Sequence, residues 1–445
     1  MRIALFVHAF FPKHFYGTET YTLDLARRLR ELGHTVTVVT THGESNVRQT
    51  ENTTRYTYLD IPVISIDKSR YPNKVVRDTY QQPMMYDVLD SIVAELRPDI
   101  AHVTHLINHT ATLLEVLNAR AVPAIATLTD FFGFCFTNKL EAADGSLCAG
   151  PNRNRSNCLA CYFKGAAEAS SQSRLVHWVN RSSFRQMRLD AVRLLSSTGP
   201  FQDTWVHHTV EGLQERPEFL RKIYQSYRGL ITPTRFLRES YAQNGFDEPM
   251  HNIWFGTDID RAAKPARLPG DALRIGFIGQ LAHHKGIDLL IEAFARLPRS
   301  AAELRIFGPT DDRPAYVQSL RDLASGLPVQ FLGTFSPGET KAIMDTLDLL
   351  VIPSRWYENS PLVLLNALAT HTPVVVSDVA GMTEFLEPDR NGVTFARSDA
   401  DSLEWALRRF VDGELDTRAM SLTTGFIRTT ASVAQEVQAI YEEIA

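Results

Sequence analysis

The sequence of 445 residues lacks a long apolar run, so no segment is expected to span a membrane. It also lacks an excess of either charge. It has 46 basic and 51 acidic residues, a net charge of −5, which gives no sign of a nucleic-acid-binding protein. No short-period repeat or low-complexity tract occurs. A chain of this length is too long for one hydrophobic core, so we expect two domains, residues 1–250 and 251–431.

The N-terminal segment lacks the features of a secretory signal. Its apolar run is interrupted by His8 and Lys13, and no small-residue cleavage site follows. A first β-strand explains the run better, and we therefore expect a cytoplasmic protein.

Cysteine is scarce and is confined to one short segment. The four cysteines are Cys135, Cys148, Cys158 and Cys161. Residues 138–157 are rich in Gly, Pro, Asn and Arg, so they lack a core of their own. Tetrahedral coordination of structural zinc by the thiolates would order this insert, at about residues 131–165. Disulfides and an iron–sulfur cluster are the alternatives.

The order of apolar segments predicts two doubly wound α/β domains with parallel sheets. The first domain opens with a strand at 2–8, a helix at 20–32 and a strand at 35–40, and the second repeats this order from 273. Further strands are expected at 100–104, 124–129, 227–234, 303–307, 329–332 and 374–376.

Polar residues follow several of these strands, at the edge where open α/β sheets bind ligands. Asp130 is the strongest candidate for a functional residue at this edge. His8 and His105 are explained as readily as ordinary polar residues leaving the core. Gly17 would let the backbone approach a ligand at the start of the first helix, although a plain turn glycine is the alternative.

Residues 351–377 carry the features of an anion site. A short apolar strand leads through a polar loop into a helix, for which Ser360 is a good N-cap and Pro361 suits the first position. The free amides of Leu362 and Val363 would then point out of the helix start, where the dipole also favours a phosphate.

This order of strand, polar loop, capped helix and buried strand resembles the donor site of family 4 glycosyltransferases. These are retaining enzymes with the GT-B fold, two Rossmann-like domains facing a central cleft. Two glutamates stand eight positions apart in that family, where this chain has Glu358 and Asn366. The resemblance implies that Glu358 holds sugar hydroxyls and that position 366 contacts the ribose. Asn366 cannot accept hydrogen bonds from both ribose hydroxyls, so an altered nucleotide preference is expected, including a deoxyribose donor such as a dTDP-sugar.

The first loop of the second domain is similar to the loop of that family that contacts the diphosphate. The family usually has Gly-Arg-Leu and then Lys-Gly, whereas this chain has Gly279, Gln280 and then Lys285. One fixed cation, Lys285, would therefore neutralise the diphosphate. Gly308 would permit close approach of a ligand, and Phe335 lies in a turn where a base ring could stack.

The first domain departs from the family at the end of one predicted strand. The strand that commonly ends in His-Asp reads Thr129-Asp130 here, and Thr129 can donate a hydrogen bond but cannot carry a proton at neutral pH. A related cysteine-bearing insert follows this strand in some family 4 sequences, and we expect it to shape the acceptor side. The predicted catalytic residues are Lys285, Glu358 and Asp130.

The resemblance implies transfer of a sugar from a nucleotide-diphosphate donor to a hydroxyl of a glycan, lipid-linked or small-molecule acceptor, with retention and without a catalytic metal. It further implies that residues 1–250 bind the acceptor, that 251–431 bind the donor, and that a last helix, 432–445, packs back on the first domain. The alternatives are a sugar-nucleotide epimerase or hydrolase and a non-catalytic homologue. The sequence leaves the donor sugar, the acceptor and the oligomeric state open.

Arginines recur between apolar residues in the segment 170–215. A basic amphipathic helix of this kind either touches anionic lipid at the inner face of a membrane or packs on its own domain. The arginines are Arg174, Arg181, Arg185, Arg188 and Arg193.

Overall fold

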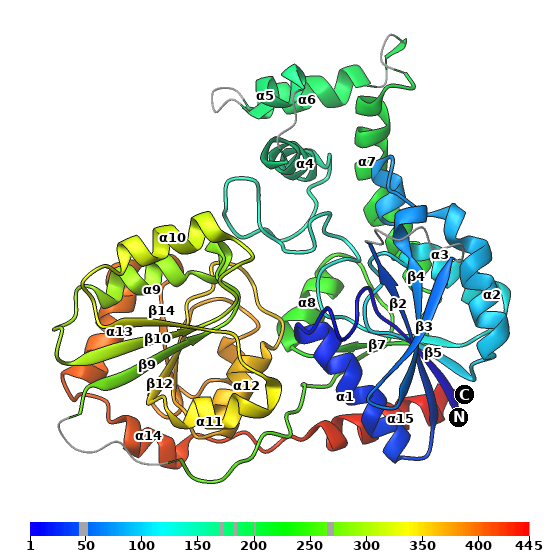
Figure 1. The fold of residues 1–445 in the computed structure, drawn as a ribbon. Coiled ribbons are helices and arrows are strands. Elements are labelled where there is room, and N and C mark those ends of the chain that lie inside the picture. The colour runs from blue at the N-terminus through cyan, green and yellow to red at the C-terminus, as the bar shows by residue number, and fades with distance from the viewer. Residues whose placement is uncertain are drawn as a thin grey trace. The chain divides into compact units, whose positions relative to one another are not determined.

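The computed structural model describes residues 1–43, 52–169, 173–180, 185–196, 198–199, 202–264 and 271–444. The chain forms two compact units, of which unit 1 comprises Met1–Ile253 with Val433–Ala445 and unit 2 comprises Trp254–Ser432. Each unit is a twisted sheet covered by helices (Figure 1).

The sheet of unit 1 has the strand order β3-β4-β2-β1-β5-β6-β7-β8. Its strand pairs are parallel except for the antiparallel pair β3–β4. The chain builds outward from β1 in one direction through β2 and in the other through β5, so the order reverses between β1 and β5. The strands are β1 (Arg2–Phe6), β2 (Thr35–His42), β3 (Thr53–Tyr58), β4 (Ile61–Asp67), β5 (Ile100–Val103), β6 (Ala124–Thr127), β7 (Gly229–Thr232) and β8 (Met250–Asn252).

Apolar residues fill the central strands of unit 1 because these strands are buried on both faces. Every residue of β5, β6 and β7 is buried, as a parallel sheet covered by helices requires. The helices that connect these strands are α1 (Gly17–Glu31), α2 (Tyr86–Leu96), α3 (Thr110–Ala119) and α8 (Arg235–Gln243).

A group of helices is inserted between β6 and β7. Helix α4 contacts α5, α6 and α7, and α7 also contacts α3 beside the sheet. Figure 1 shows α5 and α6 at the outer end of this group, away from the sheet. The helices are α4 (Ser156–Glu168), α5 (Arg174–Asn180), α6 (Arg185–Ser196) and α7 (Trp205–Tyr224).

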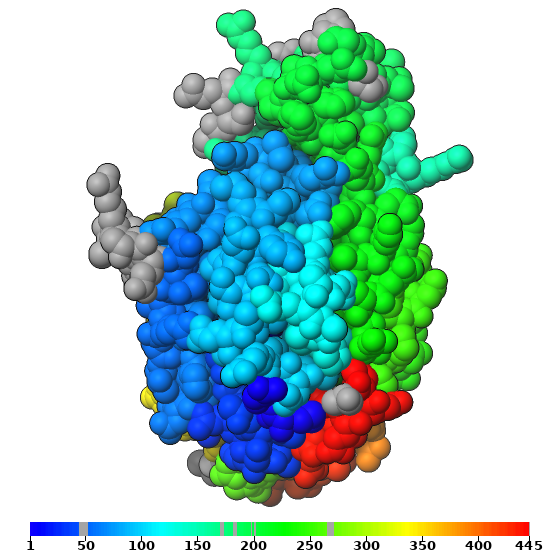
Figure 2. Space-filling model, turned by 90° about the vertical axis from the view of Figure 1, so that its right-hand side faces the viewer, coloured from blue at the N-terminus to red at the C-terminus, as the bar shows by residue number. Residues whose placement is uncertain are grey.

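The last helix, α15 (Thr430–Ile444), ends on the sheet of unit 1. Tyr441 Oη lies 2.6 Å from His102 Nδ1, and His102 Nε2 lies 2.7 Å from Thr127 Oγ1. Burial lowers the pKa of His102 to about 3, so its ring is neutral. Figure 2 shows this helix in red beside the N-terminal residues in dark blue.

Unit 2 is an all-parallel sheet with the strand order β11-β10-β9-β12-β13-β14. The strands are β9 (Leu273–Ile278), β10 (Ala302–Phe307), β11 (Val329–Gly333), β12 (Leu349–Ile352), β13 (Val374–Ser377) and β14 (Gly392–Phe395). The helices are α9 (Ile287–Phe294), α10 (Pro314–Leu323), α11 (Thr340–Asp345), α12 (Leu362–Ala369), α13 (Ala400–Val411) and α14 (Thr417–Thr423). One hydrophobic core packs a face of this sheet against helices α9, α10 and α13, and Leu290, Leu304 and Val375 are fully buried in it.

The predicted strands are confirmed with differences at their ends. The strand predicted at 124–129 ends at Thr127, and the helix predicted over 20–32 begins at Gly17 and ends at Glu31. The sequence analysis did not predict the β3–β4 hairpin. No helix in the described ranges is long and apolar enough to cross a membrane.

Candidate functional site

Two glycines allow the loops of unit 2 to meet at the carboxyl ends of β9 and β12. Gly286 ends the loop that carries Lys285, has φ +72°, and would place a Cβ atom 1.9 Å from the Pro353 carbonyl oxygen. Gly381 has φ +89°, and a Cβ atom there would lie 1.4 Å from the Glu358 carbonyl oxygen. Only glycine fits either position, so both loops depend on these residues.

Lys285 and Glu358 form an ion pair where these loops meet. Lys285 Nζ lies 2.6 Å from Glu358 Oε1. The same oxygen accepts hydrogen bonds from Ser354 Oγ at 2.8 Å and from Trp356 Nε1 at 3.2 Å. Glu358 is 9% exposed, and a carboxylate this buried needs such partners. The structure thus brings together two of the three predicted catalytic residues.

A second ion pair fixes the loop around Lys285, and the sequence analysis missed it. The Arg355 guanidinium binds the Asp288 carboxylate through two contacts of 2.6 and 3.0 Å, and the Arg355 amide donates to the His284 carbonyl at 2.8 Å. Burial disfavours ionisation of Asp288, yet its pKa is lowered because Arg355 and Tyr316 donate to it. The two residues lie 67 positions apart, so no local pattern could have revealed the pair.

The predicted helix cap at Ser360 is wrong. Helix α12 begins at Leu362, with Pro361 at the N-cap position. Ser360 has φ +58°, and its buried hydroxyl makes no hydrogen bond within the described part of the chain. The left-handed backbone at Ser360 turns its side chain away from the helix amides. Leu362 and Val363 still form the first turn of α12, as expected.

Asn366 is held by a residue that the sequence analysis did not select. Its Oδ1 accepts a hydrogen bond from Thr257 Oγ1 at 2.6 Å, and Thr257 Oγ1 itself accepts from the Ile259 amide at 3.3 Å. The carbonyl oxygen of the Asn366 amide is therefore engaged, and its NH₂ group is the part that can reach a ligand.

The other predicted donor residues lie at the same edge of the sheet. A Cβ atom at Gly308 would lie 2.1 Å from the Gly279 carbonyl oxygen, so the packing of these two turns explains why residue 308 is glycine. Gln280 is half-buried beside Gly279. The Phe335 ring packs edge-to-face on Phe307, with 5.7 Å between centroids.

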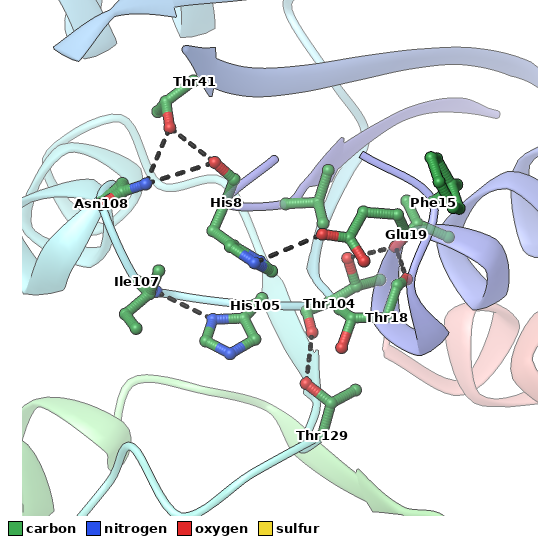
Figure 3. Close-up of polar contacts among 12 residues, drawn as sticks. His8, Phe15, Thr18, Glu19, Thr41, Thr104, His105, Ile107, Asn108 and Thr129 are labelled. Carbon is green, nitrogen blue, oxygen red and sulfur yellow. Dashed lines mark hydrogen bonds and ion pairs between the residues drawn. The ribbon is translucent and has the colours of Figure 1, made fainter. Parts of the chain in front are cut away.

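The carboxyl edge of the unit 1 sheet holds a cluster of imidazole and carboxyl groups (Figure 3). His8 follows β1 and His105 follows β5, and their ring centroids are 4.4 Å apart at the point where the strand order reverses. His8 Nε2 lies 3.4 Å from Glu19 Oε1, in the first turn of α1. His105 Nε2 lies 3.0 Å from Asp130 Oδ2. This is the position where open α/β sheets bind ligands.

The protonation of this cluster follows from its burial. Burial and the neighbouring histidines lower the pKa of His8 well below its usual range, and burial raises the pKa of Glu19. His8 Nδ1 is buried without a hydrogen-bond partner among the described residues. His105 Nδ1 accepts from the Ile107 amide at 3.1 Å, so a neutral His105 carries its proton on Nε2 and donates to Asp130.

The remaining predicted residues of unit 1 lie beside this cluster. Thr129 Oγ1 donates to the Thr104 carbonyl at 3.3 Å, and Figure 3 shows it next to His105. Gly17 opens helix α1, and no atom lies within 4 Å of the position that a Cβ atom would take. The fold itself therefore does not require glycine at this position, and close approach of a ligand to Gly17 stays a prediction.

Two family models match the chain. Glycosyltransferase Family 4 matches residues 15–139, and Glycosyl transferases group 1 matches residues 258–423. The chain belongs to the family 4 glycosyltransferases. The first match includes Glu19, His105 and Asp130, and the second includes Lys285 and Glu358.

Curated members of the family match parts of the chain. An uncharacterized glycosyltransferase of Methanocaldococcus jannaschii is 36% identical over 31% of this chain and 36% of its own length. A D-inositol 3-phosphate glycosyltransferase of Nocardioides is 32% identical over 35% of this chain and 38% of its own length. The chain thus spans less than half the length of these relatives.

Solved structures of the GT-B fold match the whole chain. UDP-bound HepE of Anabaena superposes with a TM-score of 0.63 at 14% identity and covers 100% of both chains. Sucrose-phosphate synthase of Thermosynechococcus elongatus superposes with a TM-score of 0.61 at 17% identity, covering 99% of this chain and 98% of its own. The predicted GT-B fold is confirmed by these matches.

The predicted zinc site of this family member is not supported. The four cysteines are free and half-buried, and the described residues contain no group of three or more His, Cys, Asp or Glu placed to hold a metal. Cys148 Sγ and Cys161 Sγ instead contact the carbonyl oxygens of Gly150 and Glu141 at 3.3 and 3.6 Å. Burial and the other cysteines raise the pKa of Cys158 to about 12, so this thiol is protonated.

Sequence reasoning underrated Glu19, His8 and His105. Glu19 is 2% exposed, which is unusual for a carboxylate in the first turn of a helix. The signal available in the sequence was the glutamate directly after Gly17-Thr18, together with a histidine after each of two neighbouring strands. The contact between them depends on the strand order, which the sequence did not provide.

Proposed function

We propose that the protein transfers a sugar from a nucleotide-diphosphate donor to a hydroxyl of a glycan, lipid-linked or small-molecule acceptor, with retention of the anomeric configuration. The Lys285–Glu358 pair at the carboxyl ends of β9 and β12 is the observation that carries this proposal. It combines a fixed cation with a buried carboxylate that can accept from sugar hydroxyls. We assign donor binding to unit 2 and acceptor binding to unit 1.

In this proposal, two groups neutralise the charge that develops on the leaving diphosphate. Lys285 supplies an ammonium group, and the amides of Leu362 and Val363 supply the start of helix α12. With these groups in place, the proposed transfer does not require a catalytic metal. Because Lys285 Nζ is paired with Glu358 in the free protein, the arriving diphosphate has to share the ammonium with the carboxylate.

The polar cluster of unit 1 is proposed to hold the acceptor hydroxyl. Glu19 can accept a hydrogen bond from a hydroxyl, and the buried His8 Nδ1 offers a second position for one. Asp130 orients His105 and is the predicted catalytic residue on this side. Thr129 supplies a hydroxyl at the position where a histidine is usual.

The nucleotide preference is proposed to follow from Asn366. Thr257 holds the amide oxygen, so Asn366 can donate to one ribose hydroxyl but cannot accept from two. We therefore propose reduced discrimination against a deoxyribose, with a dTDP-sugar among the donors. HepE, with which this chain shares its fold, has been solved with UDP and with UDP-glucose, which makes UDP the natural reference.

A non-catalytic sugar-nucleotide-binding protein is the second candidate. Thr129 and Asn366, which replace residues that are usual in the family, favour it. An epimerase or hydrolase on the same fold is distinguished by its products, because it would turn over a sugar nucleotide without an acceptor.

A two-stage experiment tests the proposed function. Thermal unfolding is first recorded with UDP, GDP, ADP, dTDP and dUDP, where a ligand at 100 times its Kd should stabilise by about 2.7 kcal/mol. Products are then analysed by mass spectrometry with the best donor, with and without a panel of acceptors. Transfer to an acceptor supports the proposal. Binding without turnover supports the second candidate, and no nucleotide binding contradicts both.

A cytoplasmic location is proposed from the four free thiols. Thiols persist in a reducing compartment, whereas clustered cysteines of secreted proteins are usually oxidised to disulfides.

A further inference from the structure

Large apolar side chains are exposed at the outer end of the inserted helices. They lie on α5, on α6 and at the start of α7, within 28 residues of sequence. They are Trp178, Met187, Leu194, Leu195 and Trp205, which are 42%, 67%, 59%, 50% and 46% exposed. Single exposed apolar residues are normal on a protein surface, but five on neighbouring helices, with α6 in contact with both α5 and α7, require an explanation.

Helix α6 is apolar on two opposite faces. Leu189 and Val192 are buried against the rest of unit 1 and account for the packing of the helix. Met187 and Leu194 are seven positions apart, which is two helical turns, so they share a second face that points outward. A surface helix needs only one apolar face to pack on its own domain, so the second face requires another explanation.

The same two helices carry a local excess of positive charge. Their described residues include four arginines and one aspartate, in a chain whose net charge is −5. The Arg188 guanidinium lies 5.4 Å from the centre of the Trp178 ring and donates to the Trp178 carbonyl at 3.1 Å. Arg174 is exposed beside them. Arg181 lies outside the described residues.

We propose that this outer helical surface, formed by the exposed side chains of α5 and α6 with Trp205, docks on an anionic lipid bilayer. Tryptophan partitions to the membrane–water interface, and leucine and methionine enter the acyl boundary below it. The exposed Arg174 and the half-buried Arg188 bind the lipid phosphates, since each arginine near an anionic surface adds to the attraction. The inference does not depend on the transferase activity proposed above.

A second copy of the chain is a less suitable occupant. A symmetric dimer buries the same patch of both copies, so two surfaces with an excess of arginine would meet. Like charges across an interface are unfavourable. The charge of this surface therefore favours an anionic partner over self-association.

Vesicle binding by the full-length protein tests this surface. Vesicles of phosphatidylcholine with phosphatidylglycerol are compared with vesicles of phosphatidylcholine alone by co-sedimentation. We expect binding to the anionic vesicles, at least tenfold weaker binding to the neutral ones, and weaker binding as salt is added. The double variant Met187→Glu with Leu195→Glu should lose at least tenfold in vesicle affinity.

A matched control and two further readouts keep the test decisive. Leu422 and Ile427, in unit 2, are 85% and 89% exposed, so changing both to glutamate alters the charge equally without touching this surface. That variant should bind as the parent does. Arg174→Gln should weaken binding about fivefold through charge alone. Tryptophan emission should shift to the blue on binding, and the shift should shrink in Trp178→Phe.

Three results would overturn the proposal. They are equal binding of the parent to neutral and anionic vesicles, undiminished binding by the Met187 and Leu195 double variant with parent-like circular dichroism, and a dimer in light scattering that this variant abolishes. The last result would assign the surface to self-association.

Discussion

The carboxyl edges of the two sheets lie at equivalent points of a doubly wound topology but hold different charged groups. In unit 2, the edge holds Lys285, whose charge is paired with the buried carboxylate of Glu358. In unit 1, it holds the neutral imidazole of His8 and, beside it, Glu19, a carboxyl group whose pKa is raised by burial. An ammonium group suits a diphosphate, whereas a neutral imidazole beside a carboxyl group suits a hydroxyl. In the proposed function, the same strand arrangement would therefore bind an anion in unit 2 and a hydroxyl group in unit 1.

Acidification should produce the largest difference in stability between the two units. The buried His102 and His109 have pKa values lowered to about 3 and about 4, so they stay neutral while the unfolded chain takes up protons below its pKa of 6.5. Their stabilising contribution is complete above pH 6.5 and is lost as the pH falls. Between pH 7 and pH 5 we expect each to cost about 2 kcal/mol.

Hydrogen exchange at pH 7 and pH 5, corrected for the intrinsic rates, measures this loss separately in each unit. Glu19 works in the opposite direction, because its raised pKa favours the folded state as it becomes protonated. The stability of unit 1 should nevertheless fall more than that of unit 2. An equal loss in both units would contradict the comparison.

Lys285→Ala should have the largest effect on the proposed reaction. It removes the ammonium group and leaves the Glu358 carboxylate buried without its cation, so we expect kcat to fall by about a hundredfold or more, about 3 kcal/mol. Steady-state kinetics and nucleotide titration measure the change. Lys341→Ala is the control, because Lys341 pairs with Asp345 on helix α11 of the same unit. Unchanged affinity and turnover in the Lys285 variant would overturn the proposed donor site.

Gly286→Ala should destabilise unit 2 and displace the Lys285 loop. Gly286 and Gly326 have nearly equal φ values, +72° and +74°, but only Gly286 is in contact with other backbone, at Pro353. Gly326→Ala should cost about 1 kcal/mol for the backbone conformation, and Gly286→Ala about 2 kcal/mol more for the clash. Denaturant unfolding measures both. Equal losses would show that the close approach to Pro353 is not required.

Glu19→Gln tests the unit 1 cluster. Glutamine keeps the shape of the side chain but replaces one acceptor oxygen with an NH₂ group, so it cannot take a proton from His8 or a hydroxyl. We expect KM for the acceptor to rise about tenfold or more, while the affinity for the nucleotide stays within twofold. Glu95→Gln, on the surface of the same unit, should change neither. A loss confined to nucleotide affinity would assign Glu19 to the donor instead.

Asn366→Glu should have the smallest effect of this series. A glutamate could keep the hydrogen bond from Thr257 with one oxygen and accept from the ribose with the other. We expect about tenfold tighter binding of UDP and little change for dUDP, measured by calorimetry. Binding of UDP at least tenfold tighter than that of dUDP by the parent protein would contradict the proposed loss of discrimination against a deoxyribose.

The sequence predicted secondary structure best for strands that are buried on both faces of a sheet, because such strands require apolar residues. The strands that precede Lys285 and Glu358 could be predicted because they are apolar except for Arg274. Strand β3 escaped prediction because its residues are half-buried or exposed, so its composition is polar. The order of the elements was sufficient to predict the doubly wound class of both units.

Long-range contacts explain most of what the sequence could not provide. The left-handed backbone of Ser360 lies in the loop that Gly381 approaches, and no local propensity indicates it. The pairs Arg355–Asp288 and His8–Glu19 join different elements, so they appear only once the sheet order is known. The zinc site predicted from the four cysteines is not supported, because these free cysteines form no group placed to hold a metal within the described residues.

The chain path through helix α15 has a consequence for folding during synthesis. Unit 2 is one continuous segment, Trp254–Ser432, whereas unit 1 is completed by residues that follow it. A ribosome therefore releases every residue of unit 2 before it releases Tyr441, the partner of His102 in the sheet of unit 1. Unit 2 can therefore reach its native state before unit 1, which is completed only when its final helix has been synthesised.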